Sequence, residues 1–342
     1  MKKCFVASIL AAAAGLASAQ SSVTIYGIVD LGVQSEHGAF ANGSKTSMIS
    51  GGNSGSRLGF RGVEDLGGGL SAIFNLQSGL NVDDGSIAQG GVFFGRTAFV
   101  GLNGGFGSVK LGRIDSALYQ STWYYDPLGD ALGGAFTRIV TLTSTYRRNN
   151  NTVDYTTPKI AGFTGQASYS FGEVAGDTEA GRRYSASVSY AQGPLSVSLA
   201  HQNVNSSPTA PASIVTTKLT ALGAAYNFNV VKLSALYQQN RDNAAPALNT
   251  RDMLVGVSVP FGPHALMASF IHHDDKARAH ADANQMALGY TYALSKRTNF
   301  YAGFSRIKND PLARFGLAAT TAGGAASGTA AKLYLAGIRH TF

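Results

Sequence analysis

The sequence predicts an all-β protein whose strands form one closed antiparallel barrel. Three observations predict this class: apolar and polar residues alternate along the whole chain, short and long connections follow each other in turn, and the strands number an even sixteen. No helix-period stretch of comparable length occurs. Only 13% of the 342 residues are charged, about half the ~25% of an ordinary soluble protein.

Each predicted strand has one apolar face. Near the start of the chain, Val23, Ile25 and Val29 share one phase, while Thr24 and Tyr26 share the other. The same alternation recurs at residues 70–76, 184–190, 195–199, 253–259 and 286–292. We therefore expect sixteen strands, at residues 23–34, 55–64, 69–79, 92–102, 107–113, 148–157, 162–171, 183–192, 194–203, 217–227, 230–240, 251–260, 264–273, 284–293, 298–307 and 331–342.

The connections between these strands are of two kinds. Short turns such as Gln192-Gly193-Pro194 contain glycine or proline and indicate tight hairpins. Long polar segments alternate with them, at about residues 35–54, 80–91, 114–147, 172–182, 203–216, 241–250, 274–283 and 308–330. Short turns at one end, long loops at the other and strands of about ten residues are typical of a transmembrane β-barrel of the outer membrane.

Closure of such a barrel would pair the first strand with the last and leave no edge exposed to lipid. A soluble β-sandwich also alternates, but its outer face carries charge. Here the second face is mostly Ser, Thr, Gly, Asn and Gln, as a water-filled lumen requires. Aromatic residues near the strand ends fit interfacial girdles: Tyr155, Phe163, Phe171, Tyr226, Phe228, Phe261, Tyr292, Phe300 and Phe342.

Residues 1–19 have the pattern of a cleavable signal peptide. Lys2 and Lys3 precede an apolar stretch that ends at Ala17-Ser18-Ala19. The mature chain, residues 20–342, is then one barrel domain in the outer membrane. It contains no cysteine, and its 25 basic and 19 acidic residues give a net charge of +6. The basic residues are scattered along an exported chain, so nucleic acid is not an expected partner.

Several segments together resemble the general-diffusion porins of Gram-negative bacteria, in particular those of β-proteobacteria. They are Ser22-Val-Thr-Ile-Tyr-Gly27, Ser56-Arg-Leu-Gly-Phe-Arg-Gly-Val-Glu-Asp-Leu-Gly67, Gly95-Arg-Thr-Ala-Phe-Val-Gly-Leu102, Phe106-Gly-Ser-Val-Lys-Leu-Gly-Arg113, Leu294-Ser-Lys-Arg-Thr298 and Gly337-Ile-Arg-His-Thr-Phe342. The resemblance implies a homotrimer of sixteen-stranded barrels in contact with lipid and lipopolysaccharide. It also implies that the third long loop folds into the channel.

The last residues of the chain resemble the signal by which the barrel-assembly machinery recognises its clients. Ile338, His340 and Phe342 alternate on one face and end in an aromatic residue. An ordinary last strand would show the same alternation.

Arginines on the predicted lumen face are the candidate pore residues. Leu58 and Phe60 face lipid by phase, which turns Arg57 and Arg61 inward; an arginine in hydrocarbon would cost about 2–4 kcal/mol at the midplane. We take Phe99 as lipid-facing and therefore Arg96 as luminal. In the strand at 148–157, Val153 and Tyr155 face outward by phase, which places Arg148 and Asp154 inward. The resemblance implies that Arg57, Arg96 and Arg148 form the basic cluster of the constriction. Further candidates for lining the pore are Arg113, Arg138, Arg147, Asp154 and Gln77.

The longest connection, residues 114–147, contains the candidate acidic residues. Asp126 and Asp130 lie beside Trp123, Tyr124 and Tyr125, more aromatic surface than an exposed loop usually carries. An inward fold would bury part of it and direct both carboxylates toward the arginines. The alternative is an extracellular flap with solvated acids.

The predicted function is passive diffusion of small anionic or neutral solutes, with a preference for anions because fixed positive charges outnumber acids at the narrowing. Diffusion needs no enzyme chemistry, cofactor or metal. His272 and His273 lie beside two aspartates, but adjacent residues of a strand point to opposite faces, which argues against a metal site. The alternative function is a plugged barrel that acts as a surface adhesin or a barrel enzyme.

Overall fold

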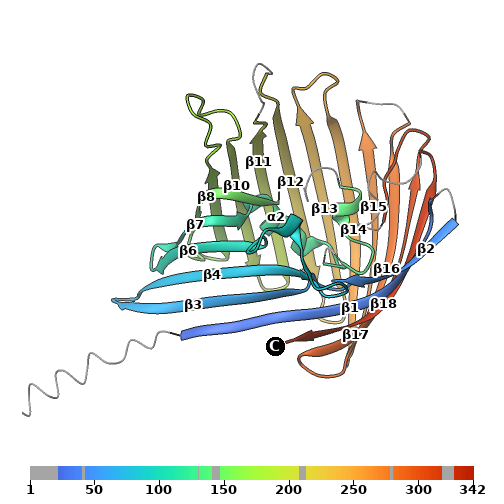
Figure 1. Ribbon diagram of the computed structural model, residues 1–342, viewed down its shortest axis with the longest axis horizontal. Coiled ribbons are helices and arrows are strands. Elements are labelled where there is room, and N and C mark those ends of the chain that lie inside the picture. Colours follow the sequence, from blue (N-terminus) through green and yellow to red (C-terminus); the bar gives the residue numbers. More distant parts are fainter. Residues whose placement is uncertain are drawn as a thin grey trace, which may run out of the picture.

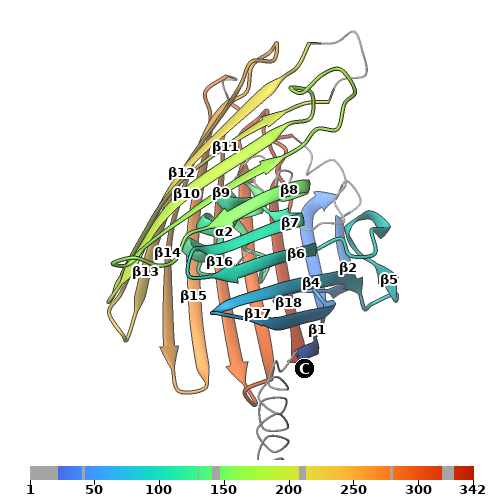
Figure 2. The ribbon, with the colours of Figure 1, turned by 90° about the vertical axis from the view of Figure 1, so that its left-hand side faces the viewer.

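The computed structural model describes residues 22–40, 43–129, 131–140, 147–207, 213–277, 280–317 and 327–342. The predicted signal peptide lies outside this range. Figure 1 shows a ring of strands, and Figure 2 shows their tilt. The strands are β1 (Ser22–Phe40), β2 (Gly43–Ser50), β3 (Arg57–Gly67), β4 (Leu70–Asn81), β5 (Ser86–Ile87), β6 (Thr97–Gly104), β7 (Gly107–Asp115), β8 (Arg148–Thr156), β9 (Phe163–Ser170), β10 (Arg183–Gln192), β11 (Leu195–Asn205), β12 (Thr216–Asn227), β13 (Lys232–Asp242), β14 (Asn249–Phe261), β15 (His264–Asp275), β16 (Ala283–Ala293), β17 (Thr298–Asn309) and β18 (Ala330–Thr341).

The sheet closes between its first and last strands, as predicted. β1 pairs antiparallel with β18 from Ile28 opposite Thr341 to His37 opposite Lys332. The backbones of Gly27 and Phe342 exchange two further hydrogen bonds, both of 3.1 Å. Closure leaves no free edge, which is the condition for placing a sheet in hydrocarbon.

Sixteen strands make up the wall. β3 pairs with the first part of β1 and β2 with its second part, so β2 and β3 are one barrel strand interrupted at residues 51–56. β5 is a two-residue strand that pairs with the end of β4 and is not counted in the wall. The prediction of a loop at 35–54 was wrong, because β1 continues to Phe40 and β2 returns beside it. Residues 43–47 of β2 carry no apolar side chain, so the alternation that marks lipid-facing strands is absent from that part of the hairpin.

The outer surface is apolar along most of its strands. Val23, Leu199, Val255 and Leu288 are more than half exposed, with 67%, 56%, 57% and 57% of their surface free. Of the predicted girdle aromatics, the exposed ones are Tyr155, Phe163, Phe171, Tyr226, Phe228, Phe261, Phe300 and Phe342. Such a surface suits lipid rather than water. No helix in the described ranges has the length and apolar character needed to cross a membrane.

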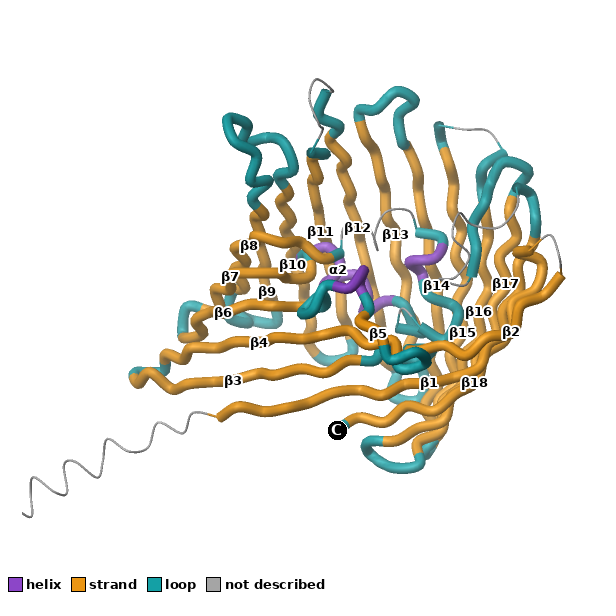
Figure 3. Tube along the Cα trace, viewed as in Figure 1, coloured by secondary structure: helices purple, strands orange, loops and turns teal. Residues whose placement is uncertain are grey.

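The hydrophobic core lies inside the barrel, between the wall and the segment that joins β7 to β8. This segment contains α2 (Ala117–Thr122), η2 (Trp123–Tyr125) and η3 (Phe136–Arg138), and it lies within the ring of strands (Figure 3). A fourth short helix, η1 (Gln89–Gly91), precedes β6. Loop residues such as Leu132 and Phe136 pack with buried wall residues such as Leu219, Leu254 and Ile271.

The position of this core tests two expectations about the lumen. The inward fold of the 114–147 loop agrees with the structure in its described parts. The mostly polar lumen face agrees only in part, because some of the wall carries aliphatic side chains that the loop covers. Burial of apolar surface against the wall therefore contributes to holding the loop inside.

Candidate functional site

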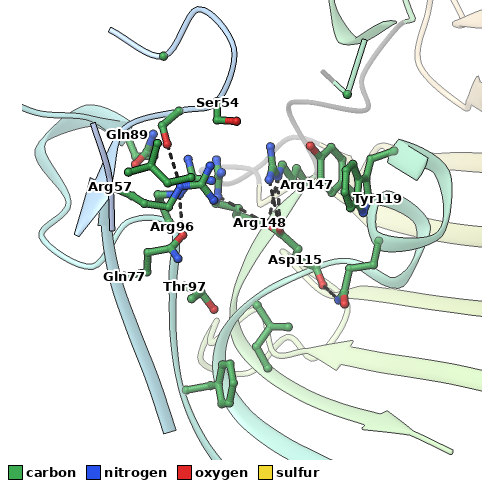
Figure 4. Close-up of a pocket in the computed structure, with 18 of the residues that line it drawn as sticks. Ser54, Arg57, Gln77, Gln89, Arg96, Thr97, Asp115, Tyr119, Arg147 and Arg148 are labelled. Atoms are coloured by element: carbon green, nitrogen blue, oxygen red, sulfur yellow. Dashed lines mark hydrogen bonds and ion pairs between the residues drawn. The ribbon is translucent and has the colours of Figure 1, made fainter. Parts of the chain in front are cut away.

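A cavity of about 770 Å³ lies in the lumen, between the inner loop and the strands of the first half of the chain (Figure 4). Among its described lining residues, five are basic: Arg57, Arg96, Lys110, Arg147 and Arg148. The one acidic residue of that set is Asp115. Gln77, Gln89 and Thr97 add polar groups, and Phe99, Tyr119 and Trp123 add rings. The cavity therefore carries a strong excess of positive charge.

Arg57 begins β3 and points into the lumen. Its neighbours Gly59 and Arg61 pair across the wall with Tyr26 and Thr24, on the inner face. The Arg57 Nε donates to the carbonyl of Gly55 at 2.8 Å, within the inward segment 51–56. Arg61 is exposed and lies against the ring of Tyr26, with 5.2 Å between guanidinium carbon and ring centroid, outside the cavity lining.

Arg96 reaches the cavity by a different route from the predicted one. Phe99 lines the cavity, and its ring centroid lies 5.7 Å from the Lys110 ammonium. Phe99 therefore faces the lumen, and its assignment to lipid was wrong. β6 begins at Thr97, so its alternation does not include Arg96. The preceding segment turns Arg96 inward, where its Nε donates to Oε1 of Gln77 at 2.7 Å.

Arg147 and Arg148 form a second pair of cations around Asp115. The Arg147 Nε lies 3.3 Å and the Arg148 Nε 3.6 Å from the Asp115 Oδ1. The Arg147 guanidinium also stacks on the ring of Tyr119, 3.8 Å from its centroid. Because one carboxylate faces two guanidiniums here, the local charge remains positive.

The remaining pore candidates lie around this cavity rather than in it. Asp154 is fully buried in the lumen wall, accepts from Gln166 at 2.8 Å and lies 3.8 Å from Lys110. Arg113 lies at the register shift between β7 and β8 and donates to the carbonyl of Gly95 and the side chain of Asn150. Arg138 lines a smaller neighbouring cavity of about 120 Å³.

The predicted acidic residues do not have the predicted geometry. Asp126 is 96% buried, and its carboxylate accepts from the backbone N–H groups of Leu128 and Phe136, both at 3.0 Å. It stabilises the turn of the loop and is absent from the described cavity lining, so its direction toward the arginines was wrong. Asp130 lies outside the described residues. Asp115, at the end of β7, takes the place expected for these acids.

Burial in this loop also affects Tyr125. Loss of water raises the pKa of its phenol above the ordinary value, which keeps the group neutral. Its ring lies against Gly223 of β12, where a Cβ would approach ring atoms to 2.2 Å.

Sequence reasoning missed a support for the cavity wall. Asp30 is fully buried and accepts from the backbone N–H of Asn53 and Ser54, at 2.9 and 2.6 Å, and from the Tyr301 hydroxyl at 2.6 Å. Arg339 donates to the Ser54 hydroxyl at 2.9 Å. This network holds the segment before Arg57. A lone aspartate in the polar phase of a strand predicts no such partner, because these residues are distant from it in the chain.

The C-terminal candidates lie on the outside of the barrel. Ile338 and Phe342 are exposed, and the His340 ring is 2.8 Å from the Thr298 hydroxyl. Separately, His273 is buried beside Asp252, at 2.6 Å, while His272 contacts Asn284. The described part of the chain holds no group of three or more potential metal ligands.

Comparison with known proteins agrees with this architecture. The profile of the family described as Gram-negative porin matches residues 6–312. The chain is 36% identical to outer membrane porin protein 32 of Delftia acidovorans, over 100% of both chains. It is 33% identical to an outer membrane porin protein of Bordetella pertussis, over 90% of this chain and 95% of that one.

A solved structure supports the same assignment. The anion-selective porin from Comamonas acidovorans matches with a TM-score of 0.84 and 33% identity, over 94% of this chain and 100% of that one. The barrel fold is therefore shared with this porin, the sequence with curated porins, and the chain belongs to the Gram-negative porin family of the outer membrane.

Proposed function

We propose that this porin is a passive diffusion channel that prefers small anions to cations. The observation that carries the proposal is the set of five basic side chains and one acidic side chain in the described lining of the luminal cavity. Fixed charges of one sign raise the local concentration of counter-ions and lower that of co-ions. The name of the Comamonas relative, an anion-selective porin, supports the same direction.

Within this proposal, Arg57, Arg96 and Arg148 set the selectivity from one wall and Arg147 from the loop. Lys110 adds to the same field, and Asp115 reduces it. Neutral hydrophilic solutes would pass by size alone. The proposal needs no enzyme chemistry, because the described lining residues act only through charge and shape.

The reversal potential of the channel in a potassium chloride gradient tests this proposal. Wild-type protein in a planar bilayer should give the sign of an anion-selective pore, and the Arg96→Ser/Arg148→Ser double variant should shift the potential toward zero. Lys276→Ser removes one positive charge beside Asp274, outside the cavity lining, and should leave the potential unchanged. A cation-selective wild-type channel would refute the anion preference.

The assembly is also proposed: a homotrimer, inserted by the barrel-assembly machinery through Ile338, His340 and Phe342, in contact with lipopolysaccharide. Solved relatives of low identity include a trimeric form of OmpT from Vibrio cholerae. Refolded protein should therefore produce large, stepwise currents with three levels. A plugged barrel with an adhesin or enzyme role would show almost no current in the same recording.

A further inference from the structure

Trp123 is an aromatic residue that is left open to the charged cavity. It lines the cavity, and 45% of its surface is exposed. In the described residues no other ring and no cation stacks on it, whereas its neighbour Tyr124 is covered by the Lys232 ammonium at 3.4 Å from the ring centroid. A large ring face open to water is a candidate for contact with a solute.

The guanidiniums and the aromatic residues meet along the inner loop. The Trp123 backbone N–H donates to the carbonyl of Tyr119, so the two rings lie on successive turns of the α2–η2 segment. Tyr119 is covered by Arg147, which pairs with Asp115. Trp123 therefore lies one helical turn after Tyr119, whose ring already contacts a guanidinium. Figure 4 shows Tyr119 beside Arg147.

The other wall offers hydrogen-bond donors to an anion. In the described structure, Arg57 and Arg96 each use the Nε for a protein carbonyl oxygen, at 2.8 and 2.7 Å, and their Nη groups donate to no described protein atom. The Arg148 Nε is buried without a hydrogen-bond acceptor in the described structure and has only the 3.6 Å ion pair with Asp115. Planar guanidiniums with free N–H groups match the two oxygens of a carboxylate.

We propose that the cavity is a binding site for aromatic carboxylates, with the carboxylate on the guanidiniums of Arg57 and Arg96 and the ring on Trp123. The cavity volume of about 770 Å³ lies within the ~300–1,000 Å³ usual for small-molecule sites. The inference rests on the proposed channel function and narrows its solutes. Aliphatic acids of equal charge would lack the contact between rings.

Block of the chloride current by two matched acids tests the inference. Benzoate and cyclohexanecarboxylate carry the same charge on rings of six carbons, but only benzoate is aromatic. The benzoate concentration that half-blocks wild-type channels should be about two- to tenfold lower than the cyclohexanecarboxylate concentration that does so, which is the range given by aromatic pairing. Trp123→Ala should remove this difference, and Trp123→Phe should keep part of it.

Tyr124→Ala is the matched control. Tyr124 is adjacent in the chain and equally exposed, at 45%, but is absent from the cavity lining. This variant should keep the wild-type preference for benzoate. Equal block by both acids in the wild type, or an unchanged preference in Trp123→Ala, would overturn the inference.

Fluorescence provides an independent readout, because Trp123 is the one tryptophan of the chain. Benzoate should quench its emission saturably, with a midpoint equal to that of the current block, and Arg57→Ser/Arg96→Ser should raise that midpoint. Quenching that only matches that of a free tryptophan amide would count against the site. An anion-selective channel that treats both acids alike would refute this inference alone, whereas cation selectivity would refute the channel proposal.

Discussion

At the scale of single residues, Asp115 is the acidic side chain that offsets the basic residues in the described cavity lining. It ends β7 and faces Arg147 and Arg148 at 3.3 and 3.6 Å. Because it is the acidic member of the described lining, its charge offsets part of the field that favours anions. Its loss would leave two guanidiniums with less compensation in a confined space.

Asp115→Asn should therefore increase the anion preference. The neutral amide keeps the shape of the side chain and removes one negative charge, so the reversal potential in a salt gradient should move further in the anion-selective direction. Asp177→Asn, in the loop between β9 and β10, removes the same charge away from the cavity lining and serves as control. Equal potentials for wild type and Asp115→Asn would contradict the assigned role.

Asp30 and Tyr301 act at the same scale on position rather than charge. Tyr301 crosses the closing seam of the barrel from β17 to reach Asp30 on β1, and Asp30 holds the N–H groups of Asn53 and Ser54. The next residue back, Gly52, accepts from the backbone N–H of Leu132 in the inner loop at 2.8 Å. The pair thus connects the seam, the segment before Arg57 and the loop.

Tyr301→Phe should lower the free energy of unfolding by about 1–3 kcal/mol, because it leaves the buried Asp30 oxygen without its donor. The midpoint of denaturant unfolding measures this loss. Open-channel current noise should rise in the same variant, since segment 51–56 loses support. Tyr334→Phe alters an exposed phenol on β18 and should change neither quantity. Identical behaviour of the two variants would exclude the seam contact as a determinant.

At the scale of elements, the inner loop stays against the wall because four glycines allow it to approach closely. Gly223, Gly256, Gly289 and Gly303 lie on β12, β14, β16 and β17, and a Cβ on any of them would approach loop atoms to 2.2–2.8 Å. At Gly303 the nearest atom is the backbone carbonyl oxygen of Leu132, at 2.4 Å. Backbone atoms cannot rotate away as a side chain can, so this contact fixes the distance between the loop and the barrel wall.

Gly303→Ala should displace the loop from the wall toward the channel axis and lower the single-channel conductance. Overpacking of this kind costs about 1–3 kcal/mol, so the thermal stability should fall as well. Gly105→Ala is a suitable control, since a Cβ there meets no atom within 4 Å. Wild-type conductance in Gly303→Ala would show that the loop position does not depend on this contact.

At the scale of the whole molecule, the closed barrel joins the two ends of the chain. β1 and β18 pair along ten residue positions, and Phe342 bonds back to Gly27. Phe342 is also 47% exposed on the outer surface, where another protein can contact it. Its backbone serves closure, and its exposed ring is the part that the proposed assembly signal would use.

Phe342→Ala should reduce the amount of folded protein in the outer membrane, while channels refolded from denaturant keep the wild-type conductance and selectivity. Phe300→Ala removes an outer-surface ring with the same 47% exposure and should leave the amount of folded protein unchanged. Equal reductions for the two variants would indicate loss of lipid contact rather than loss of an assembly signal. Quantified membrane fractions and bilayer recordings give the two measurements.

The sequence by itself determined the wall of this porin. A period of two is set by the pleat of each strand, and a lipid exterior forces apolar residues into one phase, so the sixteen strands and their two faces can be predicted locally. The inward direction of Arg57 followed from this phase, whereas a register shift between β7 and β8 breaks the phase before Arg148, which nevertheless lines the cavity. The 43–50 strand did not follow from the phase, because its residues 43–47 carry no apolar side chain.

The tertiary structure alone decided how the cavity is built. Arg96 precedes its strand, Asp115 rather than Asp126 meets the arginines, and Asp30 reaches Tyr301 across 271 positions of sequence. The Asp30–Tyr301 contact depends on closure of the barrel, and the position of Arg147 beside Asp115 depends on where a loop of about thirty residues lies inside it. That position is set by glycine clearances and buried aliphatic side chains on distant strands, and no local periodicity records a contact between residues so far apart in the chain.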